Sequence, residues 1–139
     1  MKSGRRWRRG ERLNAPTQKK DDGSKKIKEI FSNLGIKGYY VLDIEGRNIC
    51  SGDFSSSKTA VISAMFATIF AASETIAYEM GVEKEINIKI EMGEGKSLLL
   101  FKADEQLIVV VELEKDSPKM RKEIERLKNM LKKVCSNSF

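Results

Sequence analysis

The sequence predicts an α+β domain: a five-stranded antiparallel sheet with helices on both faces, forming a three-layer α/β/α sandwich. Three observations support this prediction. Strand-like segments alternate with segments whose apolar residues recur at helical spacing. Only a few residues join consecutive strands, and such short connections imply antiparallel pairing. The last two strand segments contain continuous apolar runs, Leu98–Phe101 and Leu107–Val111, as expected when both faces of a strand are covered. The predicted order is helix, two strands, helix, three strands, helix.

The first helix and a hairpin open the predicted domain. We expect the helix to begin at Ser24, whose hydroxyl can cap it, and to end at Gly35. Its apolar residues follow helical spacing: Ile27, Ile30, Phe31 and Leu34. Residues 38–43 and 47–51 are predicted to be strands, and the turn at 44–46 makes them a hairpin.

The middle helix has an unusual composition. Fifteen residues, Thr59 to Ser73, carry no charge, within a helical pattern that we expect to run from a capping Ser57 to Gly81. A surface helix of a small domain normally keeps a polar face in water, and this segment offers almost none. We therefore expect it to bury one side on its own sheet and the other on a second subunit. The alternative is a helix buried between two layers of one domain. The uncharged run falls short of the roughly 20 residues that span a bilayer.

Projection at 100° per residue divides this helix into two surfaces. The large side chains are expected to pack on the sheet of the same chain: Val61, Ile62, Met65, Phe66, Ile69, Phe70, Ile76 and Met80. The small or short side chains would let a second helix approach closely. These predicted interface residues are Ala60, Ser63, Ala64, Ala67, Thr68, Ala71 and Thr75, with Glu74 and Tyr78 near the end.

Three further strands and a last helix complete the predicted domain. Residues 86–92 alternate between apolar and polar side chains, which predicts a strand with one polar face. A turn at 93–95 separates this strand from an apolar run at 97–101, and a turn at 103–105 separates that run from a second one at 107–113. The final helix is expected to begin at Ser117-Pro118, because proline is favoured at the first helical position. Its apolar stripe is Ile124, Leu127, Leu131 and Val134.

The charge is concentrated at the N-terminus. Residues 1–26 contain ten Lys/Arg against three Asp/Glu, whereas residues 27–139 contain sixteen against seventeen. We therefore divide the chain into a basic disordered tail, 1–23, and a domain, 24–135. In the tail, one aromatic side chain among four guanidinium groups suits nucleic acid or an anionic membrane surface. These candidate contacts are Arg5, Arg6, Trp7, Arg8 and Arg9; the alternative is a tail that only solubilises the chain.

No catalytic, metal-binding or cofactor-binding residues can be assigned from the sequence. The chain has no histidine, which removes the commonest general base and metal ligand. Gly93 to Ser97 superficially resembles a phosphate-binding loop, but Ile90 occupies the position of its first glycine and a strand follows. Cys50 and Cys135 match no metal or redox spacing, so we expect reduced thiols. No signal peptide is evident, and we expect a cytoplasmic protein.

The segment Tyr40-Val-Leu-Asp43-Ile-Glu-Gly46-Arg-Asn-Ile-Cys-Ser-Gly52, followed by an alanine-rich helix, resembles the Roadblock family. That family includes dynein light chains and small-GTPase regulators of bacteria and archaea. Its pattern is a strand ending in Asp, a turn ending in Gly, a second strand and a middle helix. Asp43, Gly46 and the helix at 57–80 occupy these places, and the resemblance covers residues 24–135. It implies the profilin-like Roadblock fold.

The resemblance also implies how the chain would assemble and act. A homodimer, or a heterodimer with a related chain, would form through the middle helix and the third strand. The two sheets would join edge to edge and the two helices would pack antiparallel. The polar residues of the third strand, Asn87, Lys89 and Glu91, would lie near the seam. The implied function is a non-enzymatic scaffold that regulates a small Ras-like GTPase, and the alternative is an adaptor subunit without effect on GTP hydrolysis.

Overall fold

A computed structural model describes residues 23–54, 57–113 and 118–138. The predicted basic tail contacts, Arg5 to Arg9, lie outside these residues. A helix at residues 23–33 precedes the other elements. The remaining elements are β1 (Tyr39–Asp43), β2 (Asn48–Ser51), α2 (Thr59–Glu79), β3 (Ile88–Glu91), β4 (Ser97–Asp104), β5 (Leu107–Leu113) and α3 (Pro118–Ser138). The element order and the α+β class agree with the sequence prediction.

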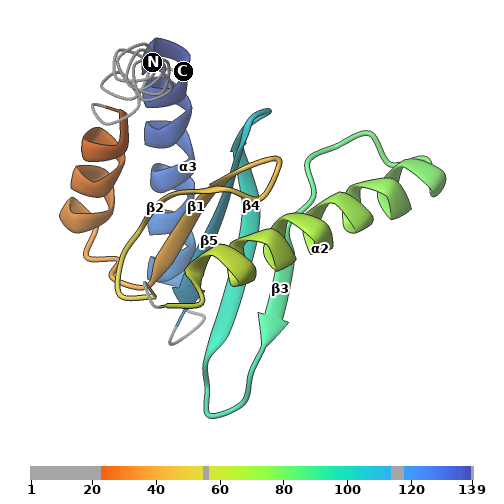
Figure 1. Ribbon diagram of the computed structural model, residues 1–139, viewed down its shortest axis with the longest axis horizontal. Coiled ribbons are helices and arrows are strands. Elements are labelled where there is room, and N and C mark those ends of the chain that lie inside the picture. The colour runs from red at the N-terminus through yellow and green to blue at the C-terminus, as the bar shows by residue number, and fades with distance from the viewer. Residues whose placement is uncertain (1–22, 55–56, 114–117, 139) are drawn as a thin grey trace, which may run out of the picture.

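The five strands form one antiparallel sheet with the order β2-β1-β5-β4-β3. The helix at 23–33 and α3 cover one face of the sheet, and α2 crosses the other face (Figure 1). The predicted three-layer arrangement is therefore confirmed. β4 and β5 are buried along most of their length because helices lie on both sides of them.

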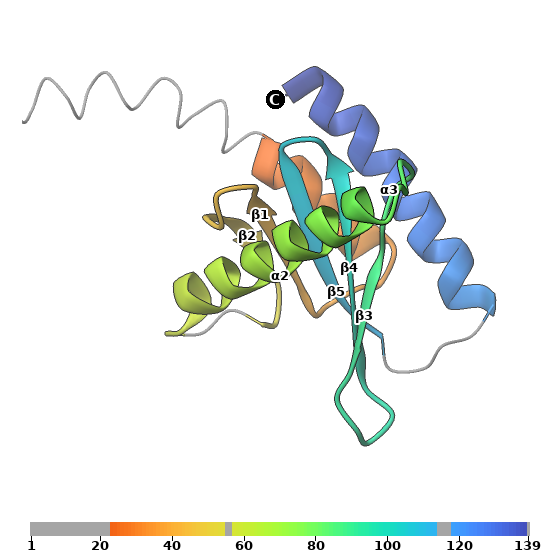
Figure 2. The same ribbon diagram turned by 90° about the vertical axis from the view of Figure 1, so that its right-hand side faces the viewer.

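Each face of the sheet has its own apolar core. On the α3 face, Ile124, Leu127 and Leu131 pack with Ile27 and Phe31 of the first helix. The Phe31 ring stacks on Tyr39 of β1 with the ring centroids 3.8 Å apart, which fixes the first helix to the sheet. The α3 and first-helix stripes predicted from helical spacing thus form this core. Figure 2 shows both helices on the same side of the sheet.

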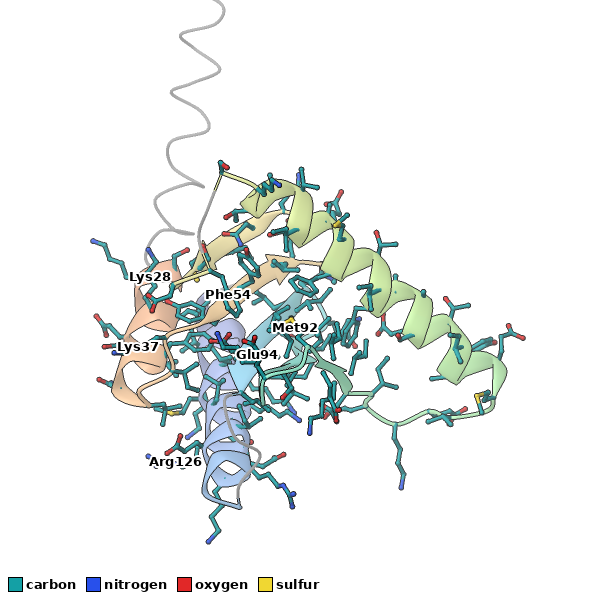
Figure 3. The ribbon with its side chains drawn as sticks, turned by 90° about the horizontal axis from the view of Figure 1, so that it is seen from below. Lys28, Lys37, Phe54, Met92, Glu94 and Arg126 are labelled. Carbon is teal, nitrogen blue, oxygen red and sulfur yellow. The ribbon has the colours of Figure 1, made fainter. Side chains whose placement is uncertain are left out.

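On the opposite face, α2 contributes Phe66, Ala67 and Phe70 to a second core that contains Tyr40 and Leu100 of the sheet. Phe54, labelled in Figure 3, packs against this core. Its carbonyl oxygen accepts a hydrogen bond from the Tyr40 hydroxyl at 3.0 Å. The segment that leads into α2 is thereby fixed to β1.

The start of α2 differs from the sequence prediction. Lys58, rather than Ser57, occupies the N-cap position, and the Lys58 side chain makes no capping hydrogen bond. Ser57 lies in a turn. The capping prediction was wrong because the N-cap falls one residue beyond Ser57, so the serine hydroxyl is not placed to cap the helix.

The β1–β2 turn approaches α2 closely at Gly46. A Cβ atom added at Gly46 would lie 2.9 Å from the Ala64 Cα and 3.3 Å from the Ala67 Cβ. The backbone of Gly46 also has a φ of +91°, which residues other than glycine rarely adopt. Glycine is therefore required here for two independent reasons.

We predict that Gly46→Ala destabilises the fold by about 2–3 kcal/mol, because left-handed strain and a clash with α2 add together. Urea denaturation at neutral pH would measure the change. Gly35→Ala is the matched control: its φ is +72°, but nothing lies within 4 Å of the added Cβ. It should cost only about 1 kcal/mol. Equal losses for the two variants would contradict the close approach of the turn to α2.

Candidate interaction surface

The outward surface of α2 is apolar and exposed. Val61, Met65 and Ile76 are 60%, 59% and 59% exposed, and Ile69 is 38% exposed. Val61, Met65 and Ile69 lie along the helix at four-residue spacing and border a shallow apolar groove with Ala60, Ala64 and Thr68. Such a contiguous apolar surface indicates an interaction site.

The division of α2 into two surfaces differs from the prediction. Phe66 and Phe70 face the sheet as expected, but Val61, Met65, Ile69, Ile76 and Met80 face outward. Conversely, Ser63 and Ala67, predicted at the subunit interface, are buried within their own chain. The prediction erred because it took small residues to be outward, whereas small residues are needed where the β1–β2 hairpin approaches α2.

Asn48 of β2 illustrates this contact. Its Nδ2 donates a hydrogen bond to the Ser63 Oγ at 3.2 Å, so the buried hydroxyl of Ser63 has a partner in its own chain. A larger side chain at position 63 would separate α2 from β2. The signal that could have indicated the inward side was Gly46, since a glycine in a turn next to an alanine-rich helix permits close approach.

The other predicted interface residues of α2 fall into two groups. Ala60, Ala64, Thr68, Ala71, Thr75 and Tyr78 are exposed. The hydroxyls of Thr68 and Thr75 donate to the carbonyl oxygens of Ala64 and Ala71 in the same helix, at 2.9 and 3.1 Å. Glu74 is instead held by its own sheet, with its Oε2 2.8 Å from the Lys102 Nζ of β4.

β3 is an edge strand. In the described part of the chain it pairs with β4 alone, so its outer edge presents unpaired backbone groups. Ile88 and Ile90 pack toward α2, while Asn87, Lys89 and Glu91 are exposed. Asn87 is not available as a free polar contact, because its Oδ1 accepts a hydrogen bond from the Lys128 Nζ at 3.0 Å.

The β1–β2 turn is held by the Asp43 carboxylate. The backbone N–H groups of Glu45 and Arg47 donate to Asp43 Oδ1 at 3.0 and 2.9 Å, and the Arg47 Nε donates to Oδ2 at 2.9 Å. Burial of the carboxyl raises its pKa, but the hydrogen bonds and the charge of Arg47 outweigh this effect and hold the pKa of Asp43 below its usual value. The turn carries Ile44, which is 42% exposed.

By length and composition alone, α2 could also cross a membrane. The helix has 21 residues, so the shortness of its uncharged run does not exclude this interpretation. Its packing supports a domain helix instead: one side is buried on the sheet, and Glu74 forms an ion pair with a charged residue of that sheet.

The described residues show little that could support catalysis. Among them, no group of three His, Cys, Asp or Glu side chains could hold a metal ion. The Gly93–Ser97 segment is a hairpin turn between β3 and β4, with positive φ at Gly93, Glu94 and Gly95, and a strand rather than a helix follows it. Burial raises the pKa of the Cys50 thiol to about 11, so this free cysteine is protonated and weakly nucleophilic at neutral pH.

The sequence and the fold of this chain are similar to those of known proteins. The model of the Roadblock/LC7 domain family matches residues 25–112. No curated protein matches the chain by sequence.

Three solved structures illustrate the similarity. MglB of Myxococcus xanthus is 20% identical with a TM-score of 0.70, covering 83% of this chain and 91% of that chain. MglB described with a tetrameric arrangement is 14% identical with a TM-score of 0.66, covering 87% and 93%. The gliding protein MglB of Thermus thermophilus is 15% identical with a TM-score of 0.62, covering 86% and 92%. At these identities the likeness concerns the fold.

We predict that Asp43→Asn lowers stability at neutral pH by about 1 kcal/mol, because the amide accepts weaker hydrogen bonds than the carboxylate. The folded-state pKa of Asp43 is lowered, so its contribution is present above about pH 4 and is lost as the pH falls through the folded pKa. Urea denaturation of both proteins from pH 7 downward should show the difference shrinking in acid. A difference independent of pH would contradict this role.

Proposed function

The chain belongs to the Roadblock/LC7 domain family, and on that premise we propose that it is a non-enzymatic dimeric scaffold that binds and regulates a small Ras-like GTPase. The observation that carries the proposal is the exposed apolar surface of α2, a helix that crosses the sheet face toward β3 (Figures 1 and 2). Within the described residues, the outer edge of β3 has no partner strand. A single subunit leaves both features uncovered.

A second copy of this chain is the occupant that suits both features. Two β3 edges can pair antiparallel about a two-fold axis, which joins two sheets into one and satisfies the open backbone groups. On the same side, two α2 helices can then pack antiparallel. The large row, Val61, Met65 and Ile69, lies beside the small row, Ala60, Ala64 and Ala71, so each helix offers ridges that fit the other.

Regulation of a GTPase is the finer part of the proposal and rests on family membership. In such a role the GTPase supplies the nucleotide and the metal, and the scaffold contacts its switch segments differently in the two nucleotide states. The neighbour described as a gliding protein is a solved example of this fold. The alternative is an adaptor subunit that assembles partners without changing GTP hydrolysis.

Binding of nucleic acid or an anionic surface through Arg5 to Arg9 stays a prediction from the sequence alone. These residues lie outside the described part of the chain. Such binding would be steeply salt-dependent and would be lost when residues 1–22 are deleted.

We predict that Met65→Glu converts the dimer to a monomer, because it places a carboxylate in the centre of the proposed α2 contact. Light scattering at micromolar concentration would measure the mass, and circular dichroism would check the fold. Lys122→Glu, on the exposed side of α3, is the matched control and should remain dimeric. Ala67→Glu is unsuitable as a test, because Ala67 is buried in its own chain. A folded Met65→Glu variant that stays dimeric would refute the interface.

The regulatory proposal makes a separate prediction. Addition of the protein to purified small GTPases from the same cell should change the rate of GTP hydrolysis or of nucleotide exchange for at least one of them. Met65→Glu should abolish the effect if the dimer is the active form. Rates unchanged for every GTPase, with a dimer still present, would favour the adaptor.

A further inference from the structure

A second surface lies on the opposite face of the sheet, between α3 and the strands β3 and β4. It is a groove of about 320 Å³, a size at the lower end of small binding sites. Its lining combines apolar side chains with charged ones: Asn87, Lys89, Leu99, Leu113, Arg121, Ile124, Glu125 and Lys128. None of these residues belongs to α2, so the α2 surface and this groove are distinct.

Lys128 is the unusual residue of the groove. It is only 9% exposed, although lysine is rarely this buried unless it is paired. Its Nζ donates a hydrogen bond to the Asn87 Oδ1 at 3.0 Å and lies 5.0 Å from the centre of the Phe101 ring. The carboxylate oxygen with which it forms an ion pair, Glu125 Oε1, is 3.7 Å away, on a side chain that is 70% exposed.

These partners compensate the ammonium charge incompletely. An amide oxygen and an aromatic face are neutral, and an exposed ion pair at 3.7 Å contributes little. An ammonium group has three donors, of which the described contacts include one hydrogen bond, to Asn87. A carboxylate entering the groove could accept from the remaining donors and replace Glu125 as the counter-charge.

Among the residues that line the groove, Lys89, Arg121 and Lys128 are basic and Glu125 is acidic. Beneath the groove, Leu99, Leu113 and Ile124 supply an apolar floor.

We propose that this groove binds a short acidic peptide segment of a partner protein, in which a carboxylate stands next to an aliphatic side chain. The carboxylate would be held by Lys128 with support from the charges of Lys89 and Arg121. The aliphatic group would cover the half-exposed Leu99 and its neighbours on the floor. Charge complementarity selects the acidic partner, and the apolar floor explains why a carboxylate alone is an incomplete ligand.

The proposal does not require the dimer proposed above. All lining residues come from one chain, and they lie on the sheet face opposite α2. Failure of the Met65→Glu prediction would leave the groove intact, and failure of peptide binding would leave the dimer intact. Both ideas involve the region of β3, its outer edge in the dimer and Asn87 and Lys89 in the groove, but they are tested by different substitutions and different measurements.

Nuclear magnetic resonance of the methyl groups of Leu99, Leu113 and Ile124 in the full-length protein would test the proposal. The probe is an acetylated and amidated octapeptide of alternating glutamate and leucine, and its control replaces every glutamate by glutamine. We expect saturable shifts of these three methyl signals with the acidic peptide, and binding about tenfold weaker or worse with the neutral one. Because the readout is local, binding of the acidic probe to the basic residues 1–22 would not imitate it.

Lys128→Met, which keeps the aliphatic stem and removes the charge, should weaken the acidic probe about tenfold or more. Lys132→Met is the matched control from the same helix: its Nζ is 3.1 Å from Glu85 Oε1, outside the groove, and it should bind like the parent protein. Glu125→Gln should bind the acidic peptide more tightly than the parent protein does, because the competing carboxylate is gone. This variant still tests the proposal if Lys128→Met does not fold.

Four results would overturn the proposal. These are the absence of methyl shifts, equal affinity for the acidic and neutral peptides, equal weakening by Lys128→Met and Lys132→Met, and unchanged or weaker binding to Glu125→Gln. Octanoate is a final comparison. Saturation of the groove by octanoate without binding of the peptide would mean a site for free carboxylic acids and would also refute the peptide proposal.

Discussion

The close approach of the β1–β2 turn to α2 determines how the helix is oriented. Gly46 lies over Ala64 and Ala67, and Asn48 bonds to Ser63, so the side of α2 toward the hairpin must be lined with small residues. Phe66 and Phe70 then enter the core beside them. Because these residues fix which side of α2 faces the sheet, Val61, Met65 and Ile69 face outward, even though their apolar side chains would also suit the core. The exposed apolar surface is thus a consequence of these packing contacts on the other side of the helix.

The elements and their order follow from sequence patterns, but the orientation of α2 does not. Residues 86–92 alternate, β5 is apolar except for Glu112, and α3 has an apolar stripe, so the pattern of each element indicates which of its sides is buried. α2 is apolar or small around its whole circumference, and its periodicity therefore contains almost no information on which side faces the sheet. Side-chain volume was the remaining cue, and it misled, because the inward side combines two phenylalanines with Ser63 and Ala67. The contacts of α2 with Gly46 and Asn48, which are distant in sequence, determine which side faces the sheet.

The surfaces on the two faces of the sheet differ in how far sequence could anticipate them. That α2 would have an uncovered side was foreseeable from the uncharged run and the small number of other elements. The groove beside α3 was not, because Asn87 and Lys128 are 41 positions apart and meet only in the folded chain. In the sequence, Lys128 is one of many lysines in a helix whose charges would ordinarily be solvated. Its burial depends on Phe101 and Asn87, which no local pattern associates with it.

β4 contributes to both faces through alternate residues. Leu98 and Leu100 belong to the core under α2, whereas Leu99 and Phe101 pack toward α3. Inserting or deleting one residue within this stretch would move each set of side chains to the opposite face of the sheet. α2 would then lose its packing contacts with β4, and Lys128 would lose both the apolar floor of its groove and its aromatic partner. We therefore expect β4 to tolerate changes of composition but not of length, and insertions next to it to be tolerated only at the hairpin tips, 92–96 and 105–106.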